Sequence, residues 1–269
     1  LAAVPEASRI LVSEDGLVDL NHLRTLLKET TKPSLISVMW ANNETGAIQP
    51  IEEITALASD VGALVHVDGV QALGKIPIDF SNSGIDMLSV SAHKIGGPTG
   101  VGALIIRDSL PVKPILVGGG QERGRRSGTE NLSGIVGFGA AAKACKTQPG
   151  ENLEVTQLRD MFEKTILEKA LGAKIIAQGV KRLGNTSAIF MPGLNAETQV
   201  MAFDLAGIAV SAGAACSSGK VKQSHVLKAM NLPDELINNT IRISFGWQNT
   251  HEDVDRLIEV WLKLFKESN

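Results

Sequence analysis

The sequence has no tyrosine, only two cysteines and few aromatic residues, which make up 4% of its 269 residues. Two cysteines, Cys145 and Cys216, are too few for a disulfide framework, so we expect a reducing compartment, the cytoplasm. Long apolar runs are missing as well. The longest stretch without a charged residue, Leu205 to Gly219, is shorter than the about 20 mainly apolar residues of a membrane-spanning helix. We therefore expect neither a disulfide-stapled protein nor a membrane protein.

A strong charge of either sign is also lacking. The 26 basic and 29 acidic residues give a net charge of −3, and the chain contains no long basic run. This balance argues against nucleic acid and anionic membranes as partners. A hydrophobic content of 43% over this length is enough for one large α/β domain or two smaller ones.

Short apolar segments alternate with helical patterns in the first part of the chain. Apolar residues at helical spacing predict a helix over residues 51–61, and nearly continuous apolar runs predict strands around it. Such runs are typical of a parallel sheet with both faces covered. The predicted strands are residues 34–40, 63–67, 87–91 and 102–106. The expected fold class is therefore α/β, with a mostly parallel sheet in this region.

The C-terminal part has a different rhythm, with longer helices and shorter apolar segments. The helix-breaking stretch Thr147-Gln148-Pro149-Gly150 is the best candidate boundary. It divides the chain into a large α/β domain, residues 1–149, and a small α+β domain, residues 150–269. The later elements expected are helices over residues 131–147, 152–171, 196–205 and 251–266, and strands near residues 173–178, 185–190, 208–211 and 240–245.

A lysine and an acid follow two of the predicted strands. Asp68 directly follows the strand at 63–67, and Lys94 follows the strand at 87–91 and precedes the glycine-rich turn Gly96-Gly97. Ligands of open α/β sheets bind at the carboxyl ends of the strands. An amine and a carboxylate placed there can hold a pyridine ring at its aldehyde and at its nitrogen. A lone lysine is more often a surface residue, and only this context favours the functional interpretation.

Several polar neighbours have plain structural alternatives. Asn43 can be a turn former, and Ser91 can satisfy backbone groups at a strand end. His66 precedes the acid by two residues, and we interpret it as a packed core histidine.

Six segments in order carry a family resemblance. Asn42–Gly46, His66–Gln71 and Ser91–Lys94 resemble the class V aminotransferases, which are fold-type I enzymes that use pyridoxal 5'-phosphate (PLP). Three later segments narrow the resemblance to the cysteine desulfurases of the NifS and IscS type. They are Gly118–Thr129, Ser211–Gly219 and Ile241–Gly246.

The resemblance implies a role for individual residues. Lys94 forms the Schiff base with PLP and moves the substrate proton. Asp68 pairs with the pyridine nitrogen and keeps it protonated. Arg242 binds the α-carboxylate of the substrate. The remaining ligands of PLP are Asn43 and Gln71 at the ring hydroxyl, with Asn43 also near the substrate, and Ser91, His93 and Thr129 at the phosphate. His93 is also expected among the catalytic residues.

The two cysteines are expected to differ. Cys216 lies in a polar stretch of small residues, where a thiol is accessible and can attack as a thiolate. The resemblance makes Cys216 the nucleophile that takes up sulfur as a persulfide and a transient ligand of an iron–sulfur cluster, with no resident metal site. Cys145 lies in an alanine-rich helical segment, and we interpret it as a structural thiol.

The basic segment Arg123 to Thr129 has an intermolecular role in the resembled family. There it crosses a homodimer interface, so that Thr129 reaches the phosphate held by the partner. The implied activity converts L-cysteine to L-alanine, with sulfur passed to acceptor proteins such as iron–sulfur scaffolds or thiolation carriers.

Two alternative hypotheses stay open. The chain can be a sibling PLP enzyme, such as a selenocysteine lyase, or a truncated chain without catalytic turnover. The second hypothesis arises because the family has an N-terminal third with a phosphate-binding Gly-Ala-Thr segment and a ring-stacking histidine. Residues 1–40 supply neither, so we expect a large domain that is incomplete at its N-terminus.

Overall fold

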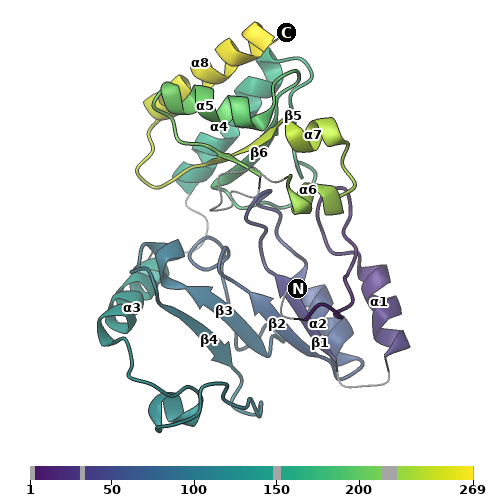
Figure 1. The fold of residues 1–269 in the computed structure, drawn as a ribbon, viewed down its shortest axis with the longest axis vertical. Helices are drawn as coiled ribbons and strands as arrows, with labels where there is room; N and C mark the ends of the chain where they lie inside the picture. The colour runs from purple at the N-terminus through teal and green to yellow at the C-terminus, as the bar shows by residue number, and fades with distance from the viewer. Residues whose placement is uncertain (1–3, 31–33, 148–152, 214–222, 269) are drawn as a thin grey trace. The chain divides into compact units, whose positions relative to one another are not determined.

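The protein is described by a computed structural model, which covers residues 4–30, 34–147, 153–213 and 223–268. Its residues form two compact units (Figure 1). The parallel-sheet unit consists of Thr30–Trp40 and Ile51–Gly150. The antiparallel-sheet unit consists of Leu1–Glu29, Ala41–Pro50 and Glu151–Asn269. The expected division of the chain into domains at residues 149 and 150 stays a prediction.

The parallel-sheet unit is built on four strands in the order β1-β2-β3-β4. Their bounds are β1 Leu35–Met39, β2 Leu64–Asp68, β3 Met87–Ser91 and β4 Gly102–Ile106. The first three strands are parallel and β4 is antiparallel to β3. The predicted mostly parallel sheet is therefore confirmed, with each strand within one or two residues of its expected position.

One face of this sheet forms the core of the unit. Ile36, Val65, Val67 and Leu88 alternate along β1, β2 and β3 and are buried. Helix α2 (Ile51–Ser59) contacts β2 and buries its apolar stripe of Ile51, Ile54 and Ala58. Because side chains alternate between the two faces of a strand, the intervening residues of β2, His66 and Asp68, belong to the other face.

The chain leaves β3 through a short helical turn. This turn, η1 (Ala92–Ile95), ends at Gly96, whose φ of 79° is in the left-handed region that glycine adopts without strain. Helix α3 (Leu132–Thr147) contacts η1.

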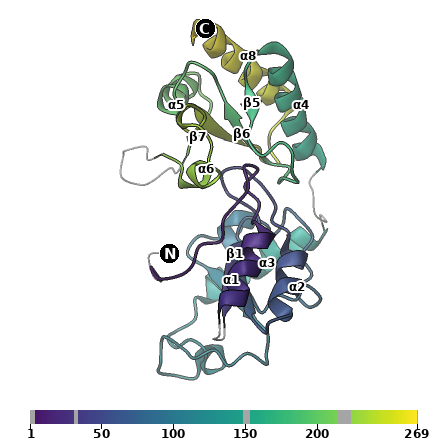
Figure 2. The same ribbon diagram turned by 90° about the vertical axis from the view of Figure 1, so that its right-hand side faces the viewer.

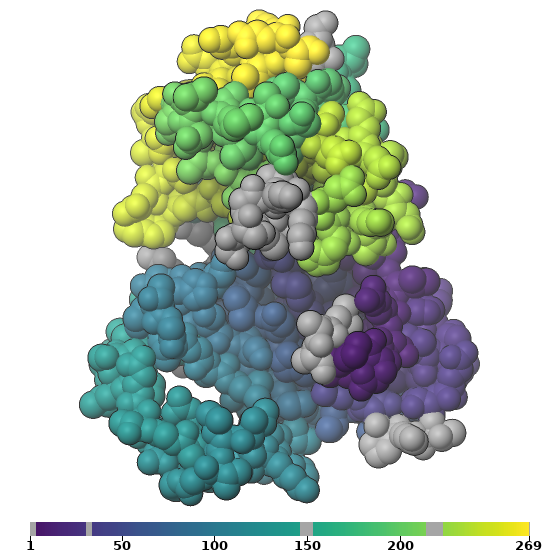
Figure 3. Space-filling view, in the orientation of Figure 1, coloured from purple at the N-terminus to yellow at the C-terminus, as the bar shows by residue number. Residues whose placement is uncertain are grey.

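The segment between β4 and α3 extends away from the rest of this unit. It contains a second turn, η2 (Gln121–Gly124), and stands out in teal in Figure 3. Its apolar residues Ile115 and Val117 are 96% and 82% exposed, so this segment contributes little to the core.

The antiparallel-sheet unit has a sheet in the order β5-β6-β8-β7, with all pairs antiparallel. The strands are β5 Lys174–Ile175, β6 Thr186–Phe190, β7 Ser211–Ala212 and β8 Thr240–Ser244. The helices are α1 Leu20–Glu29, α4 Leu153–Lys169, α5 Ala196–Leu205, α6 His225–Ala229, α7 Asp234–Asn238 and α8 His251–Ser268. The α+β expectation for the C-terminal region is confirmed.

Two long helices supply much of the core of this unit. Helices α4 and α8 lie side by side in both views of the ribbon (Figures 1 and 2). Phe162 of α4, Phe203 of α5 and Trp261 of α8 are completely buried in one cluster with the strand residues Ile189 and Ile241. Among the described residues, no helix combines the length and the apolar character that a membrane span requires.

Two strands are shorter than predicted. The segment 173–178 yields only the two residues of β5, because Ala177 turns the chain with a positive φ of 58°. The segment near 208–211 contributes β7 only at its end, where Ser211 and Ala212 pair with β8. Both are edge strands, whose length depends on how many residues pair with the one neighbouring strand.

The turn Ala41–Pro50 is bridged to Arg182, which forms a buried ion pair with Glu163. Ala47 bridges to Arg182, and Leu183 donates its amide hydrogen to the Gly46 carbonyl at 2.8 Å. The Arg182 guanidinium donates two hydrogen bonds, of 2.8 and 2.7 Å, to the Glu163 carboxylate on α4. Both side chains of this pair are less than 10% exposed, at 6% and 8%.

We expect Glu163→Gln to destabilise the protein by about 3–5 kcal/mol, because the substitution leaves the Arg182 charge buried without a counter-charge. Chemical denaturation monitored by circular dichroism measures this change. The matched control is Glu267→Gln, which removes an exposed partner of Lys263 on α8. A midpoint of Glu163→Gln equal to that of the control contradicts the prediction.

Candidate active site

The carboxyl ends of β2 and β3 bring the expected acid and lysine to one edge of the parallel sheet. Asp68 is the last residue of β2 and is paired in register with Ser89 of β3. Lys94 follows in η1, directly after β3. Because β2 and β3 are parallel, both groups leave the sheet on the same side. The sequence-based placement of these two residues at strand ends is confirmed.

The backbone around Asp68 is tightly held. Its Oδ1 accepts a hydrogen bond from the Val70 amide at 3.0 Å, and its carbonyl accepts one from the Trp40 amide at 2.9 Å. The next amide, of Gly69, donates to the Ser89 carbonyl at 2.8 Å. No ion pair joins Asp68 to any residue in the described ranges. The carboxylate is therefore oriented and has capacity to bind a cation.

Lys94 has an exposed side chain in η1. Its amine makes no hydrogen bond or ion pair with a residue that the structure describes. Beside it, Ser91 Oγ and His93 Nδ1 are hydrogen-bonded at 2.8 Å. A hydroxyl, an imidazole and an amine thus lie within four consecutive residues. The hydroxyl and the imidazole can donate hydrogen bonds to a phosphate, and the amine can react with a carbonyl carbon.

Gln71 and Thr129 also lie in the parallel-sheet unit. The Gln71 Oε1 accepts a hydrogen bond from Lys75 Nζ at 3.0 Å, which fixes the side-chain amide. Thr129 is exposed, and its carbonyl accepts a 3.4 Å hydrogen bond from Arg126. In the same segment, Arg125 lies 3.6 Å from Asp108.

Asn43 and Arg242 lie in the antiparallel-sheet unit, where the structure brings them together. The Arg242 Nη1 on β8 donates to the Asn43 carbonyl at 3.0 Å, and its Nη2 donates to Ser211 Oγ at 3.2 Å. The buried Nε has no hydrogen-bond partner among the described residues. Since a buried donor without a partner is costly, this atom is a candidate contact for a ligand oxygen.

The turn that presents Asn43 is shaped by its own side chains. Asn42 Oδ1 accepts hydrogen bonds from the amides of Glu44 and Thr45, at 2.8 and 3.0 Å. Gly46 closes the turn with a φ of 77°. The Asn42 side chain thus accepts the hydrogen bonds of this turn, and no described residue is hydrogen-bonded to the Asn43 side chain.

Two buried residues in this region were not expected from the sequence. Ser224 Oγ donates a 2.5 Å hydrogen bond to the Glu44 carboxylate and accepts one from the Leu227 amide at the start of α6. Glu44 and Ser224 are 5% and 1% exposed and 180 residues apart in the chain. The local sequence around either residue does not predict this hydrogen bond, because it joins two segments that are far apart in the chain.

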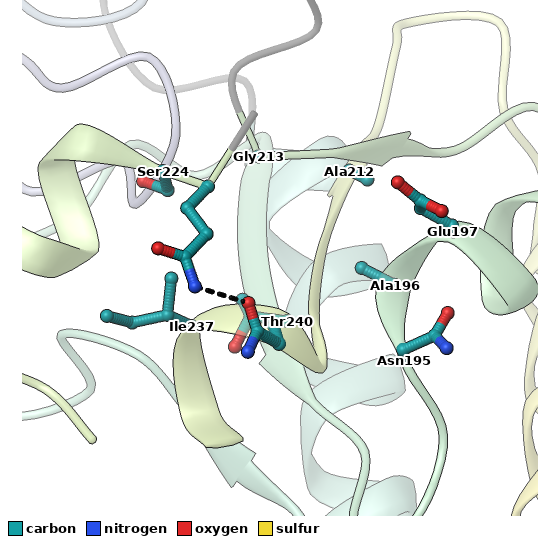
Figure 4. A pocket seen from close by; sticks show the side chains of 10 residues that line it. Asn195, Ala196, Glu197, Ala212, Gly213, Ser224, Ile237 and Thr240 are labelled. Atoms are coloured by element: carbon teal, nitrogen blue, oxygen red, sulfur yellow. Dashed lines mark hydrogen bonds between the residues drawn. The ribbon is translucent and has the colours of Figure 1, made fainter. Parts of the chain in front are cut away.

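One pocket of this unit is lined by residues other than the expected site residues. It has a volume of about 310 Å³ and is shown in Figure 4. Gln223 Nε2 donates to Asn238 Oδ1 at 2.9 Å in its wall. The lining residues are Asn195, Ala196, Glu197, Ala212, Gly213, Gln223, Ser224, Ile237, Asn238 and Thr240.

The structure describes one of the two cysteines, Cys145. Cys216 lies outside the described residues, so its expected role stays a prediction. Cys145, on α3, is partly buried, and a Cβ atom at Gly74 would lie only 2.9 Å from its Sγ. Burial raises the pKa of the Cys145 thiol above its usual value.

His66 differs from the core histidine that we expected. The side chain is half-buried and both of its ring nitrogens are hydrogen-bonded to serines, to Ser37 Oγ and to Ser89 Oγ, each at 2.8 Å. The expectation was wrong because His66 shares the face of β2 that carries Asp68, and the apolar core lies on the opposite face.

Comparison with known proteins identifies the relatives of this chain. Residues 5–257 match the family model of the class-V aminotransferases. The chain is 45% identical to a cysteine desulfurase of Cereibacter sphaeroides over 252 residues, and 44% identical to the cysteine desulfurase NifS of Azotobacter vinelandii over 251 residues. These alignments cover 94% and 93% of this chain, but only 64% and 62% of the relatives.

The similar solved structures include a NifS-like protein and a cysteine desulfurase, and they confirm the α/β fold class. A NifS-like protein from Rickettsia africae ESF-5 is 38% identical with a TM-score of 0.88, over 96% of this chain and 69% of that one. A cysteine desulfurase from Thermococcus onnurineus NA1 is 26% identical with a TM-score of 0.80, over 97% of this chain and 66% of that one.

We expect the Cys145 thiol to be alkylated slowly in the folded protein. Since burial raises its pKa, less thiolate is present at pH 8, and iodoacetamide should react at least about tenfold more slowly than with the same cysteine in urea. Mass spectrometry of the Cys145 peptide over time measures both rates. Equal rates in the folded and unfolded protein contradict the prediction.

Proposed function

Because the chain belongs to the class V aminotransferase family, we propose that the protein is a PLP-dependent cysteine desulfurase. The reaction converts L-cysteine to L-alanine and transfers the sulfur atom to Cys216 as a persulfide. This proposal rests on Asp68 at the end of β2 and Ser91–Lys94 at and after the end of the parallel strand β3, because both lie at the same edge of the sheet.

The residues present fit the cofactor. The Lys94 amine and the Asp68 carboxylate, neither in an ion pair with a described residue, match the aldehyde and the protonated nitrogen of a pyridine ring. Ser91 and His93 offer neutral or positive donors to the phosphate, and Gln71 and Asn43 offer amides to the ring hydroxyl. When bound, PLP supplies an electron sink for the Cα carbon of the substrate.

The side chains of this chain divide the remaining work. Asp68 holds the proton on the pyridine nitrogen, since a carboxylate stabilises a cation that lies against it. Lys94 Nζ takes the proton from the substrate Cα. The planar guanidinium of Arg242, already held by Asn43 and Ser211, binds the α-carboxylate.

Sulfur transfer belongs to Cys216. Its thiolate attacks the substrate Sγ, so that an S–S bond forms while the Cβ–S bond breaks. The Cβ carbon gains a proton and leaves as the methyl group of alanine, and the terminal sulfur stays on Cys216. A thiol acceptor then takes this sulfur, and we expect acceptors of the iron–sulfur scaffold or thiolation-carrier class. Transient ligation of an iron–sulfur cluster by Cys216 is part of this proposal.

We further propose a homodimer in the cytoplasm, with Thr129 directed to the cofactor of the partner. The support is the exposure of the Arg123 to Thr129 segment and of the neighbouring apolar residues Ile115 and Val117. Clustered exposed apolar side chains are typical of protein contact surfaces.

We expect Lys94→Ala to abolish covalent attachment of PLP and to lower alanine formation by about 10²–10⁴-fold or more, because the variant lacks both the amine and the base. Borohydride reduction followed by mass spectrometry shows whether the cofactor mass is attached to the protein. A borohydride-stable adduct in Lys94→Ala would overturn the assignment.

We expect Cys216→Ala to keep PLP binding and to lose both alanine production and protein-bound sulfur, because no thiolate is present to receive the sulfur. Incubation with ³⁵S-labelled L-cysteine and mass spectrometry after alkylation locate the sulfur. Cys145→Ala is the matched control and should behave like the wild type. Sulfur found on Cys145 contradicts the proposal, and a faster reaction with selenocysteine than with cysteine favours the sibling lyase.

A further inference from the structure

A row of hydrogen bonds crosses three strands beside Asp68. Ser37 Oγ of β1 bonds to His66 Nδ1 of β2 at 2.8 Å, and His66 Nε2 bonds to Ser89 Oγ of β3 at 2.8 Å. Both ring nitrogens are thus occupied, and the row ties together the three parallel strands of the unit.

This row and Asp68 share one face of the sheet. His66 and Asp68 are two residues apart on β2, so their side chains point to the same side. The strand register pairs Ser37 with His66 and Ser89 with Asp68. Ser89 is therefore both the hydrogen-bond partner of His66 and the cross-strand neighbour of Asp68.

The hydrogen bonds suit a neutral imidazole. A neutral ring has one donor and one acceptor nitrogen, and each serine hydroxyl can donate and accept, so the row closes in either direction. A cationic ring donates from both nitrogens, and both hydroxyl protons then need other acceptors. Burial lowers the pKa of His66 below its usual value, and the Asp68 carboxylate opposes this shift only in part.

Charged groups around the ring are few. The residues facing it from β1 and β3 are the uncharged Ser37, Met87 and Ser89, and the charge that acts on it is Asp68 on its own strand. Over the described ranges His66 and Asp68 form no ion pair. The hydrogen bonds and the lowered pKa of His66 both favour a neutral ring beside Asp68.

We propose that His66 is a positioning residue that acts through Asp68: locked between Ser37 and Ser89 as a neutral ring, it braces the end of β2 and leaves the negative charge of Asp68 uncompensated. The carboxylate is then available in full to a cationic group of a ligand. This inference rests on the proposed function, in which that group is the protonated nitrogen of PLP.

The first test measures the ionisation of His66 directly, without cofactor. Nitrogen-15 NMR of the apo protein, assigned with His66→Asn, should show a neutral ring at pH 7 and a pKa below 6.5. In Asp68→Asn the pKa of His66 should fall further, because the carboxylate that favours the cationic ring is gone. A cationic ring at pH 7, or an unchanged pKa in Asp68→Asn, overturns the proposal.

The second test measures PLP binding by absorbance titration. His66→Asn keeps a neutral side chain but is too short to span both serines, so the rise in its dissociation constant for PLP measures the loss of the bracing hydrogen bonds alone. His66→Lys places a cation beside Asp68 and should weaken binding by about tenfold or more, equivalent to at least one pKa unit of charge interaction. Equal losses in both variants indicate a purely structural role and overturn the proposal.

A pH comparison covers the case in which His66→Lys does not fold. Below the pKa of His66 the wild-type ring gains a charge, so wild-type PLP affinity should fall more steeply with decreasing pH than that of His66→Asn. Parallel curves overturn the proposal. His225→Ala, which removes an exposed histidine of α6, is the control and should follow the wild type. Failure of all forms to bind PLP refutes the proposed function, whereas the NMR result judges His66 independently.

Discussion

Parallel pairing of β1, β2 and β3 is the constraint on which the candidate site depends. Parallel strands begin and end in the same sense, so whatever follows their carboxyl ends meets at one edge of the sheet. Asp68 and the Ser91–Lys94 turn reach the same edge for this reason alone. Ser37 pairs with His66 in register, and Ser89, the register partner of Asp68, lies on the same face of the sheet. The antiparallel β4 closes the sheet beside β3 without adding a group to that edge.

The local sequence pattern was sufficient to predict long helices and those strands that pair with a neighbouring strand along their whole length. The apolar runs at β2, β3 and β4 and the helical spacing of α2, α5 and α8 predicted these elements nearly to the residue. The strand-end placement of Asp68 and Lys94 followed from the same runs. The short edge strands β5 and β7 were overestimated, because their length is decided by neighbours and not by their own composition.

Contacts across long stretches of sequence escaped prediction. The Glu44–Ser224 hydrogen bond and the pairing of Ala47 with Arg182 join segments whose local patterns are unrelated. His66 was misjudged because an alternating strand offers two faces, and only the fold shows that one face carries serines from both neighbouring strands. The polar face of a central strand was therefore the feature that composition alone could not assign.

The position of the Ala41–Pro50 turn bears on the order in which the chain can fold. The turn lies between β1 and α2 in sequence, yet its partners Arg182, Ser224 and Arg242 are supplied by the C-terminal half of the chain. A ribosome delivers the N-terminal residues first, so this turn emerges long before the groups that satisfy Glu44 exist. The parallel sheet can form around an unfinished insertion, and completion of the turn is one of the last events of biosynthesis.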